Sequence, residues 1–470
     1  MGLGRNFRRW GTLAFIAVMV LSPQAASADS LTPDRITAAL SKLELLAEGV
    51  VADGAVPGLA IGVVHDDKVV FLRGFGRREA GKPETVDADT VFQIASLSKP
   101  VSATIVAALV SEGIVSWDAK IVDLDPAFRL AEPYPTSELT VRDLFSHRSG
   151  LPGTAGDDLE DIGYDRAEIL RRLRFVSPSS SFRAGYSYSN FGLTEGAVAA
   201  AKPTGKSWEE VAEEKLYRPL KMVSTSSRHA DFIKHANRAA LHVKIDGVWA
   251  AKVKRDPDAQ APAGGVSSTA RDLSQWVRLV LGNGVYAGET LIKADALDQT
   301  HVPLMARGRN PVSGGTSFYG LGWNVEFGRH GLSWGHAGAF SVGARTLVTV
   351  FPEEKLGIVA NAFSTGVPEG LSDSFADLVF DGTVEKDWIK AWDDTYAGLF
   401  GPAIAAANAT YAAPPSPASP ARPASAYAGR YSNDFIGDAV VSTAGDTLVL
   451  KVGPAGARSY SLKDSTATSS

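Results

Sequence analysis

The spacing of apolar positions divides the first part of the chain into a helix, a pair of strands and a second helix. Thr32-Pro33 supplies a capping residue and a proline at the first helical position, and apolar residues then recur at helical spacing. Two apolar runs joined by a polar turn, 59–64 and 69–72, predict two strands. From Ser96 to Glu112 the pattern is helical and dense in Ala and Val, so we expect this helix to be buried.

The pattern continues with helices and then returns to strands. Helical spacing covers three further segments, 165–175, 207–216 and 269–281. In the first of these, Glu168 stands where a capping box requires it. Strand-like runs follow at Trp334, 346–350 and 356–360. The order of strand pair, helices and late strands predicts an α+β layer structure rather than alternating βαβ units.

The composition is that of a globular protein, and it limits the chemistry available. The 470 residues are 45% apolar and 21% charged, which excludes a wholly disordered, collagenous or coiled-coil chain. The net charge of −5 provides no excess of positive charge with which to bind the phosphates of a nucleic acid. Cysteine is absent, which excludes disulfides, thiolate nucleophiles and zinc–thiolate sites. Covalent chemistry must come from Ser, Thr, Lys, Asp, Glu or His.

The first residues are typical of an export signal. A basic start is followed by a short apolar run and by the small residues Ala26-Ser27-Ala28. We therefore expect 1–28 to be a signal peptide and the protein to be periplasmic or secreted, with no stable membrane span after cleavage. An uncleaved membrane anchor is the alternative. The pair Arg8-Arg9 leaves twin-arginine export open beside the Sec route.

The strongest chemical signal is the single S-x-x-K motif of the chain, Ser96-Leu97-Ser98-Lys99. At this spacing the side chains of Ser96 and Lys99 share one face of a helix. A serine hydroxyl needs a neighbouring base to become a nucleophile, and burial can lower the pKa of a lysine toward neutrality. We predict that Ser96 is the nucleophile and Lys99 its base. A serine-capped helix with a lysine one turn later is the structural alternative.

Two further motifs accompany Ser96 and Lys99. In Tyr188-Ser189-Asn190 the tyrosine can relay a proton, since a cationic neighbour stabilises phenolate, and Asn190 can donate to a substrate carbonyl and hold Lys99. The alternative is a buried structural tyrosine in a turn. A second copy, Tyr431-Ser432-Asn433, shows how easily the tripeptide arises by chance.

The third motif is His336-Ala337-Gly338, ahead of an apolar strand. Gly338 lets a substrate backbone approach closely. The Ala339 N–H can complete an oxyanion hole with the N–H of Ser96. His336 is expected to hydrogen-bond Tyr188 or the substrate, and an exposed strand histidine is the alternative.

With these motifs in place, the chain resembles the penicillin-binding, class C β-lactamase-like serine hydrolases, and within them the CubicO group. The resemblance runs from about residue 31 to 363 and rests on ten stretches in family order: Pro57–Ala60, Asp89–Phe92, Ser96–Lys99, Leu144–Pro152, Tyr188–Asn190, Thr204-Gly205, Pro219–Met222, Ala263–Thr269, Tyr319–Trp323 and His336–Gly338. It implies an acyl-enzyme at Ser96 and a base system of Lys99 with Tyr188. The implied fold is an antiparallel sheet flanked by helices plus a mostly helical lobe.

Two departures from the family pattern bear on the substrate. Class C β-lactamases carry a K-T-G triad where this chain has His336-Ala337-Gly338, and a histidine there resembles D,D-peptidases, D-aminopeptidases and some esterases of the family. Ala337 also lacks the hydroxyl that the family uses toward a substrate carboxylate. Efficient β-lactam hydrolysis and strict recognition of a C-terminal carboxylate are therefore not expected.

The resemblance and the composition suggest a division of the chain after the signal peptide. We expect a β-lactamase-related catalytic domain at 29–385, a helical extension at 386–411 and a Pro/Ala-rich linker at 412–426. Segment 427–470 alternates like three or four short strands and resembles the start of a lipocalin-like domain of CubicO-type peptidases. It is too short for an eight-stranded barrel, which is therefore either truncated or completed by another copy of the chain.

Other motifs are weaker. Gly331-Leu332-Ser333-Trp334-Gly335 matches the G-x-S-x-G elbow of α/β-hydrolases, but a strand-like run follows it and His336 is far too close. His147 is expected to fix a loop. No metal-ligand spacing and no glycine-rich phosphate loop is present, so we expect neither metal nor cofactor.

The sequence thus predicts a serine hydrolase that acts on a small peptide, amide or ester. A peptidase or amidase of the D,D-peptidase or D-aminopeptidase type is favoured, because His336 or Tyr188 can protonate an amine leaving group. The alternatives are a carboxylesterase or weak β-lactamase, and a catalytically idle protein that binds peptidoglycan or peptides. The oligomeric state is left open.

Overall fold

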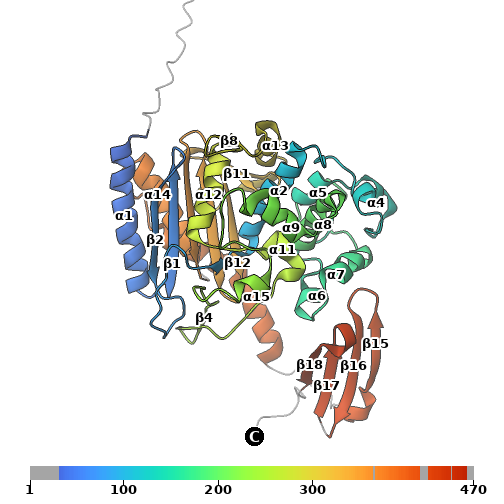
Figure 1. The fold of residues 1–470 in the computed structure, drawn as a ribbon. Coiled ribbons are helices and arrows are strands. Elements are labelled where there is room, and N and C mark those ends of the chain that lie inside the picture. Colours follow the sequence, from blue (N-terminus) through green and yellow to red (C-terminus); the bar gives the residue numbers. More distant parts are fainter. Residues whose placement is uncertain (1–30, 364–365, 413–421, 446, 463–470) are drawn as a thin grey trace, which may run out of the picture.

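The computed structural model describes residues 31–363, 366–412, 422–445 and 447–462. The predicted signal peptide at 1–28 and most of the predicted linker at 412–426 lie outside these residues. The described chain forms a large antiparallel sheet with helices on both faces, a helical lobe on one side and a small separate sheet at its C-terminal end (Figure 1). This arrangement confirms the predicted fold class.

The large sheet has eight strands in the order β2-β1-β14-β13-β12-β11-β10-β9, and every neighbouring pair is antiparallel. Their bounds are β1 Gly58–His65, β2 Lys68–Gly76, β9 Met305–Arg309, β10 Thr316–Tyr319, β11 Asn324–Gly328, β12 Gly331–Phe340, β13 Ala344–Phe351 and β14 Leu356–Ala362. The early hairpin therefore pairs with the last strand of the sheet, so residues about three hundred positions apart become neighbours.

Helices α1 (Pro33–Ala52) and α14 (Val367–Phe380) cover one face of this sheet, and α12 (Ala270–Leu281) packs on the other (Figure 1). The hydroxyl of Thr32 accepts the N–H of Arg35, so the predicted cap of α1 is confirmed. α12 begins after Thr269 in the same way. Apolar residues of α1 and α14 meet those of β1 and β14 in a continuous buried cluster.

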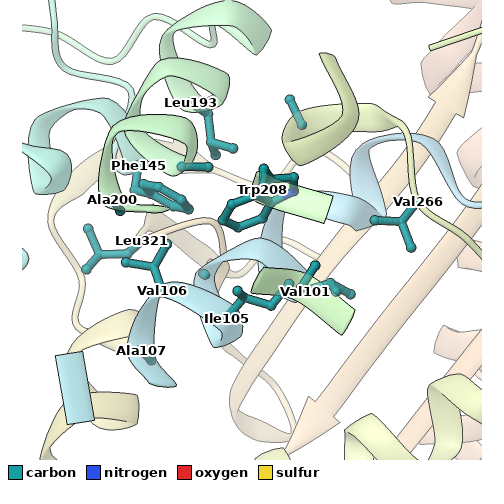
Figure 2. Close-up of a cluster of buried hydrophobic side chains, with 14 of the residues drawn as sticks. Val101, Ile105, Val106, Ala107, Phe145, Leu193, Ala200, Trp208, Val266 and Leu321 are labelled. Atoms are coloured by element: carbon teal, nitrogen blue, oxygen red, sulfur yellow. The ribbon is translucent and has the colours of Figure 1, made fainter. Parts of the chain in front are cut away.

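The helical lobe is built around α2 (Ser98–Ser111), which is buried on all sides along most of its length. Figure 2 shows Val101, Ile105 and Val106 of this helix among side chains that include Phe145 and Trp208. Burying each such side chain contributes about 1.5–3 kcal/mol. The other helices of the lobe are α3 Ile121–Leu124, α4 Pro133–Glu138, α5 Val141–Phe145, α6 Asp157–Asp161, α7 Arg166–Arg172, α8 Asn190–Ala201, α9 Trp208–Ala212, α10 His229–Phe232, α11 Ala261–Gly264 and α13 Ala294–Asp298.

The predicted capping box at α7 forms only in part. Asp165 accepts the N–H of Glu168 at 2.9 Å, as a capping residue does. The carboxylate of Glu168 does not return to the cap but pairs with Arg171 and Arg172, at 2.6 and 2.7 Å. Two guanidinium groups within one turn offer a carboxylate stronger partners than a backbone N–H.

The long helix α15 (Trp388–Ala412) leads away from the sheet toward the four-stranded C-terminal sheet (Figure 1). This sheet is antiparallel in chain order: β15 Gly429–Asn433, β16 Gly437–Ala444, β17 Thr447–Val452 and β18 Arg458–Leu462. Three pairs of short strands complete the described elements: β3 Phe92–Gln93 with β6 Ser267–Ser268, β4 Val243–Ile245 with β5 Val248–Ala250, and β7 Val285–Tyr286 with β8 Glu289–Thr290. In the described part of the chain, no helix is both apolar and long enough to cross a membrane.

Candidate active site

Ser96 lies in a tight turn between β3 and α2. The turn is a short 3-10 helix, η1 (Ala95–Leu97), and Ala95 enters it with a positive φ of 49°. The hydroxyl of Ser98 stabilises this turn. It donates to the Ala95 carbonyl at 2.6 Å and accepts the Val266 N–H at 3.0 Å. A non-glycine residue at positive φ costs about 1–3 kcal/mol, and such strain is common where a reactive side chain is held in place.

Lys99 is fully buried, and its ammonium nitrogen has three acceptors around it. Nζ lies 2.7 Å from Asn190 Oδ1, 2.9 Å from the Ala263 carbonyl and 3.1 Å from Ser96 Oγ. Burial lowers the pKa of Lys99 to about 7, while the charge of Asp157 opposes this shift. In the neutral amine, two N–H groups serve Asn190 and Ala263, so the lone pair is left to face Ser96.

Tyr188 lies on the other side of this amine. Lys99 Nζ is 4.4 Å from the centre of its ring, over the aromatic face. Burial raises the pKa of Tyr188 well above its ordinary value, although a hydrogen bond with Ser96 opposes the rise. Burial therefore favours the neutral phenol of Tyr188 over the phenolate considered from the sequence, and the catalytic role of Tyr188 stays a prediction. Tyr188 is a neutral hydroxyl next to Ser96.

Asn190 is the first residue of α8 and connects Lys99 to a carboxylate. Its Oδ1 accepts from Lys99, and its Nδ2 donates to Asp157 Oδ2 at 2.9 Å. One amide N–H is therefore committed to the protein and one is left for a substrate carbonyl. Burial raises the pKa of Asp157 to about 6, and the hydrogen bond from Asn190 and the charge of Lys99 oppose the rise.

His336 lies in the middle of β12 and bonds Tyr319 rather than Tyr188, the protein partner considered from the sequence. Its Nε2 accepts from the hydroxyl of Tyr319 at 3.0 Å, and its Nδ1 donates to the Ala337 carbonyl at 2.7 Å. The rings of His336 and Tyr188 are 6.3 Å apart between centroids. Burial lowers the pKa of His336 to about 3, so the ring is neutral at physiological pH. A neutral ring bonded at both nitrogens is a fixed wall of the site rather than a proton source.

Gly338 brings β12 directly against the turn that carries Ser96. A Cβ at this position would lie 2.1 Å from the Ile94 carbonyl oxygen and 2.8 Å from the Leu97 nitrogen. Thr346, opposite Gly338 on β13, donates to the same Ile94 carbonyl at 2.7 Å. Ala339 follows as an exposed residue of the same strand. Its role in an oxyanion hole stays a prediction.

His147, Tyr186 and Tyr319 form a cluster of aromatic rings behind Tyr188. The ring of His147 lies 4.6 Å from Tyr188 and 5.0 Å from Tyr319 between centroids. Its Nδ1 accepts the Ser189 N–H at 3.1 Å, and burial lowers its pKa well below the ordinary value. His147 thus holds the loop that presents Tyr188, which is the structural role expected from the sequence.

Three residues of this site were not predicted to belong to it, although Tyr319 begins one of the family stretches. Asp157 and Tyr319 enter through their hydrogen bonds to Asn190 and His336. Arg307 of β9 is an exposed cation that lies 5.4 Å from the centre of the Tyr186 ring. Its charge lowers the pKa of His336 and opposes the rise at Tyr186 and Tyr188. Only the folding of distant segments brings these residues to the site.

Two rival sites can be compared with this one. Ser333 of the G-x-S-x-G sequence lies within β12, paired with Glu326, and not on a turn from a strand to a helix. His330, Asp377 and Asp381 could supply metal ligands, since their ligand atoms lie within 4.8 Å of one another. The guanidinium of Arg329 contacts both carboxylates and also Glu385, so these acids already share a cation. The absence of a metal stays a prediction.

The comparison with known proteins agrees with this geometry. A family model described as Beta-lactamase matches residues 43–378. Unguisins hydrolase ungD' of Aspergillus campestris is 26% identical over 329 residues, which are 66% of this chain and 59% of that protein. Penicillin-binding protein 4 of Amycolatopsis lactamdurans is 27% identical over 336 residues, which are 68% of this chain and 83% of that protein.

One solved structure extends the comparison to the fold. The octameric penicillin-binding protein homologue from Pyrococcus abyssi has a TM-score of 0.64 and 20% identity, and the match covers 90% of this chain and 89% of that chain. This chain spans 59% of the Aspergillus relative, so that protein's activity is not carried over with the family. Because the family model covers most of the chain and the fold agrees, the chain belongs to the β-lactamase family of serine hydrolases.

Proposed function

We propose that the protein hydrolyses an amide bond of a small peptide through an acyl-enzyme on Ser96. The observation that carries the proposal is the buried amine of Lys99, 3.1 Å from Ser96 Oγ, with a pKa lowered to about 7. An amine of this pKa is half neutral near pH 7 and can take the hydroxyl proton. The complete base system disfavours an idle binding protein.

The proposed reaction begins when the Ser96 Oγ–H proton moves to Lys99 Nζ and Oγ bonds to the substrate carbonyl carbon. The N–H groups of Ser96 and Ala339 would stabilise the oxyanion. The Tyr188 hydroxyl gives its proton to the leaving amine nitrogen as the C–N bond breaks, and Lys99 returns a proton to Tyr188. Water then attacks the acyl carbon, loses a proton to Lys99, and releases the acid while Ser96 regains its proton.

For the substrate, we infer a peptidase or amidase of the D,D-peptidase or D-aminopeptidase type. D-alanyl-D-alanine-carboxypeptidase/endopeptidase AmpH of Escherichia coli, 24% identical over 339 residues, supports this class. Those residues are 68% of this chain and 84% of that protein. Ala337 offers no hydroxyl to a substrate carboxylate, which favours substrates other than those held by a terminal carboxylate. A carboxylesterase or weak β-lactamase with the same nucleophile is the second candidate.

The test is intact-mass spectrometry after incubation with a fluorescent penicillin. We expect one adduct on the wild type, none on Ser96→Ala, and an unchanged adduct on the matched control Ser333→Ala. The reverse pattern would overturn the assignment of Ser96. If the wild type forms no adduct, turnover of short nitrophenyl esters that depends on Ser96 would favour the esterase, and its absence would favour a binding protein.

We also propose that the protein is exported and loses residues 1–28. The basic start, the apolar run and the small residues at 26–28 support this proposal. Intact mass of the protein recovered from a periplasmic or secreted fraction tests it, with Asp29 expected as the first residue. A mass that includes the leader would contradict cleavage.

A further inference from the structure

A large cavity lies apart from Ser96, between the helical lobe and the C-terminal sheet. Its volume is about 1070 Å³, and Ser96, Lys99 and Tyr188 are not among its lining residues. Helices α6, α7 and α8 and Arg458 of β18 contribute to its wall, and Figure 1 shows α6 and α7 beside the small sheet. The volume is at the upper end of the range for small-molecule sites.

Glu195 of α8 is the unusual residue of this wall. It is 0% exposed, and neither of its carboxyl oxygens has a hydrogen-bond partner among the described residues. A buried carboxyl without a partner is destabilising, and most buried polar groups in proteins are satisfied. Burial raises the pKa of Glu195 well above its ordinary value; the charge of Asp125 adds to the rise and that of Lys202 opposes it.

A second carboxyl group of the cavity has hydrogen-bond partners at only one of its two oxygens. Glu160 Oε2 accepts from Arg255 and Gln260, whereas its Oε1 has no partner among the described residues. Burial raises the pKa of Glu160 to about 7. Two carboxyl groups of the cavity lining therefore contain buried hydrogen-bond acceptors that lack donors.

The cations around the cavity already have partners. Lys202 pairs with Asp125 at 2.6 Å, Arg166 pairs with Glu209 at 2.7 Å, and Arg458 donates to the Asp161 carbonyl at 3.0 Å. Arg171 pairs with Glu168, and Arg174 donates to the Ala127 carbonyl. No partner is left over for Glu195, so the group missing at its oxygens is a hydrogen-bond donor rather than an anion.

We propose that this cavity is a second binding site, for an organic ammonium compound whose nitrogen donates to Glu195 while its apolar part packs against Phe128, Leu170 and Val198. An ammonium has three N–H donors and no acceptor, which matches a wall with unpaired carboxyl oxygens. The three apolar residues line the same cavity. An ammonium also supplies the opposite charge that makes ionisation of a buried carboxyl favourable.

The test is calorimetric titration of the full mature chain with 2-phenylethylammonium chloride, and with 2-phenylethanol as the neutral analogue. We expect saturable binding of the ammonium, at least about tenfold weaker binding of the alcohol, and at least about tenfold weaker binding of the ammonium by Glu195→Gln. The matched control is Asp373→Asn, which changes another carboxyl with a pKa raised by burial, bonded to Trp392 and outside the cavity lining. It should bind like the wild type.

Ser96→Ala separates the two sites and should bind the ammonium unchanged. Loss of binding in Ser96→Ala would place the ammonium in the active site and overturn the proposal. No saturable binding by the wild type, or equal affinity for the ammonium and the alcohol, would also overturn it. If Glu195→Gln does not fold, Ala167→Trp replaces it: Ala167 is exposed and lines the cavity, so an indole there should block entry. Unchanged binding in that variant would contradict the site.

Discussion

Lys99 shows that a residue's surroundings decide its chemistry. Its ammonium would stay charged in water, but here it is buried between Asn190, the Ala263 carbonyl and Ser96. Desolvation lowers its pKa from 10.5 to about 7. Desolvation also raises the pKa of Tyr188, so burial favours the neutral form of both groups. A neutral amine beside a neutral hydroxyl can both accept a proton from Ser96 and pass one on.

The pH dependence of acylation follows from the pKa of Lys99. Below about pH 7 the ammonium form predominates and cannot accept the Ser96 proton, so the acylation rate should rise about tenfold per pH unit and level off above pH 7. Stopped-flow measurement of the acylation rate between pH 5 and 9 tests this pH dependence. Lys99→Ala should be folded and acylate very slowly at every pH. An acylation rate that stays constant between pH 5 and 9 would contradict neutral Lys99 as the base.

Asp157 is expected to act as a positioning residue through Asn190. In Asp157→Ala the amide of Asn190 loses its anchor and Lys99 loses the charge that raises its pKa. We expect slower acylation, and we expect the rise of the acylation rate with pH to occur about one pH unit lower. Asp157→Asn keeps an acceptor for Asn190 without the charge. It should therefore restore most of the acylation rate, but the pH at which the rate rises should stay lower than in the wild type. If the acylation rate rises at the wild-type pH in both variants, Asp157 has only a packing role.

At the scale of elements, the junction between β12 and the η1 turn determines whether the site is assembled. Gly338 is the contact point, because any side chain there would overlap the backbone at Ile94 and Leu97. The turn itself is held by Ala95 at positive φ and by the two bonds of Ser98. Ser96 is therefore positioned by rigid backbone contacts from a strand and a helix.

Gly338→Ala tests this junction. The new methyl group would meet the Ile94 carbonyl, so β12 must move away, and we expect about 1–3 kcal/mol lower free energy of unfolding together with loss of acylation. Gly328→Ala on β11 is the matched control, since a Cβ there lies 3.7 Å from its nearest neighbour. Urea unfolding and acylation rates of both variants measure the effect. Normal acylation in Gly338→Ala would show that the junction tolerates a shift.

At the scale of the whole molecule, the C-terminal sheet contacts the helical lobe and not the catalytic centre. The Tyr164 hydroxyl donates to the Ile436 carbonyl at 3.0 Å, and Arg172 donates to the Phe435 carbonyl at 2.7 Å. From the other side, Arg458 reaches the Asp161 carbonyl. These contacts border the proposed ammonium site.

Removal of residues 413–470 tests what the C-terminal sheet contributes. We expect acylation of Ser96 within about twofold of the full chain, because all fully buried members of the clusters around the sheet and α2 precede residue 413, and only the partly buried Phe435 and Ile436 pack against them from the removed segment. Ammonium binding should weaken, since the cavity loses Arg458 and becomes more open. Acylation and calorimetry on the shortened chain provide both readouts. A collapse of acylation would show that the small sheet supports the catalytic centre.

The sequence by itself indicated many of the elements and the candidate nucleophile, but not the strands β9, β10 and β11 or the helix α14. Helices, hairpin and late strands follow from local periodicity, capping residues and turns, and Ser96 and Lys99 are adjacent because helical spacing places them on one face. Local signals such as these are complete within a few residues. The same signals identify Tyr188, Asn190 and His336 as candidates, but not the groups to which each is bonded.

Only the tertiary structure decided the partners and the protonation states. Asp157 meets Asn190, and Tyr319 takes the place predicted for Tyr188 as the partner of His336, through contacts between segments far apart in the chain. The pKa of Tyr188 rises instead of falling because desolvation depends on everything packed around a group. Glu195 is an apparently ordinary residue of a helix until the fold buries it without a partner. Burial and long-range contacts are properties of the packed chain, so no local pattern encodes them.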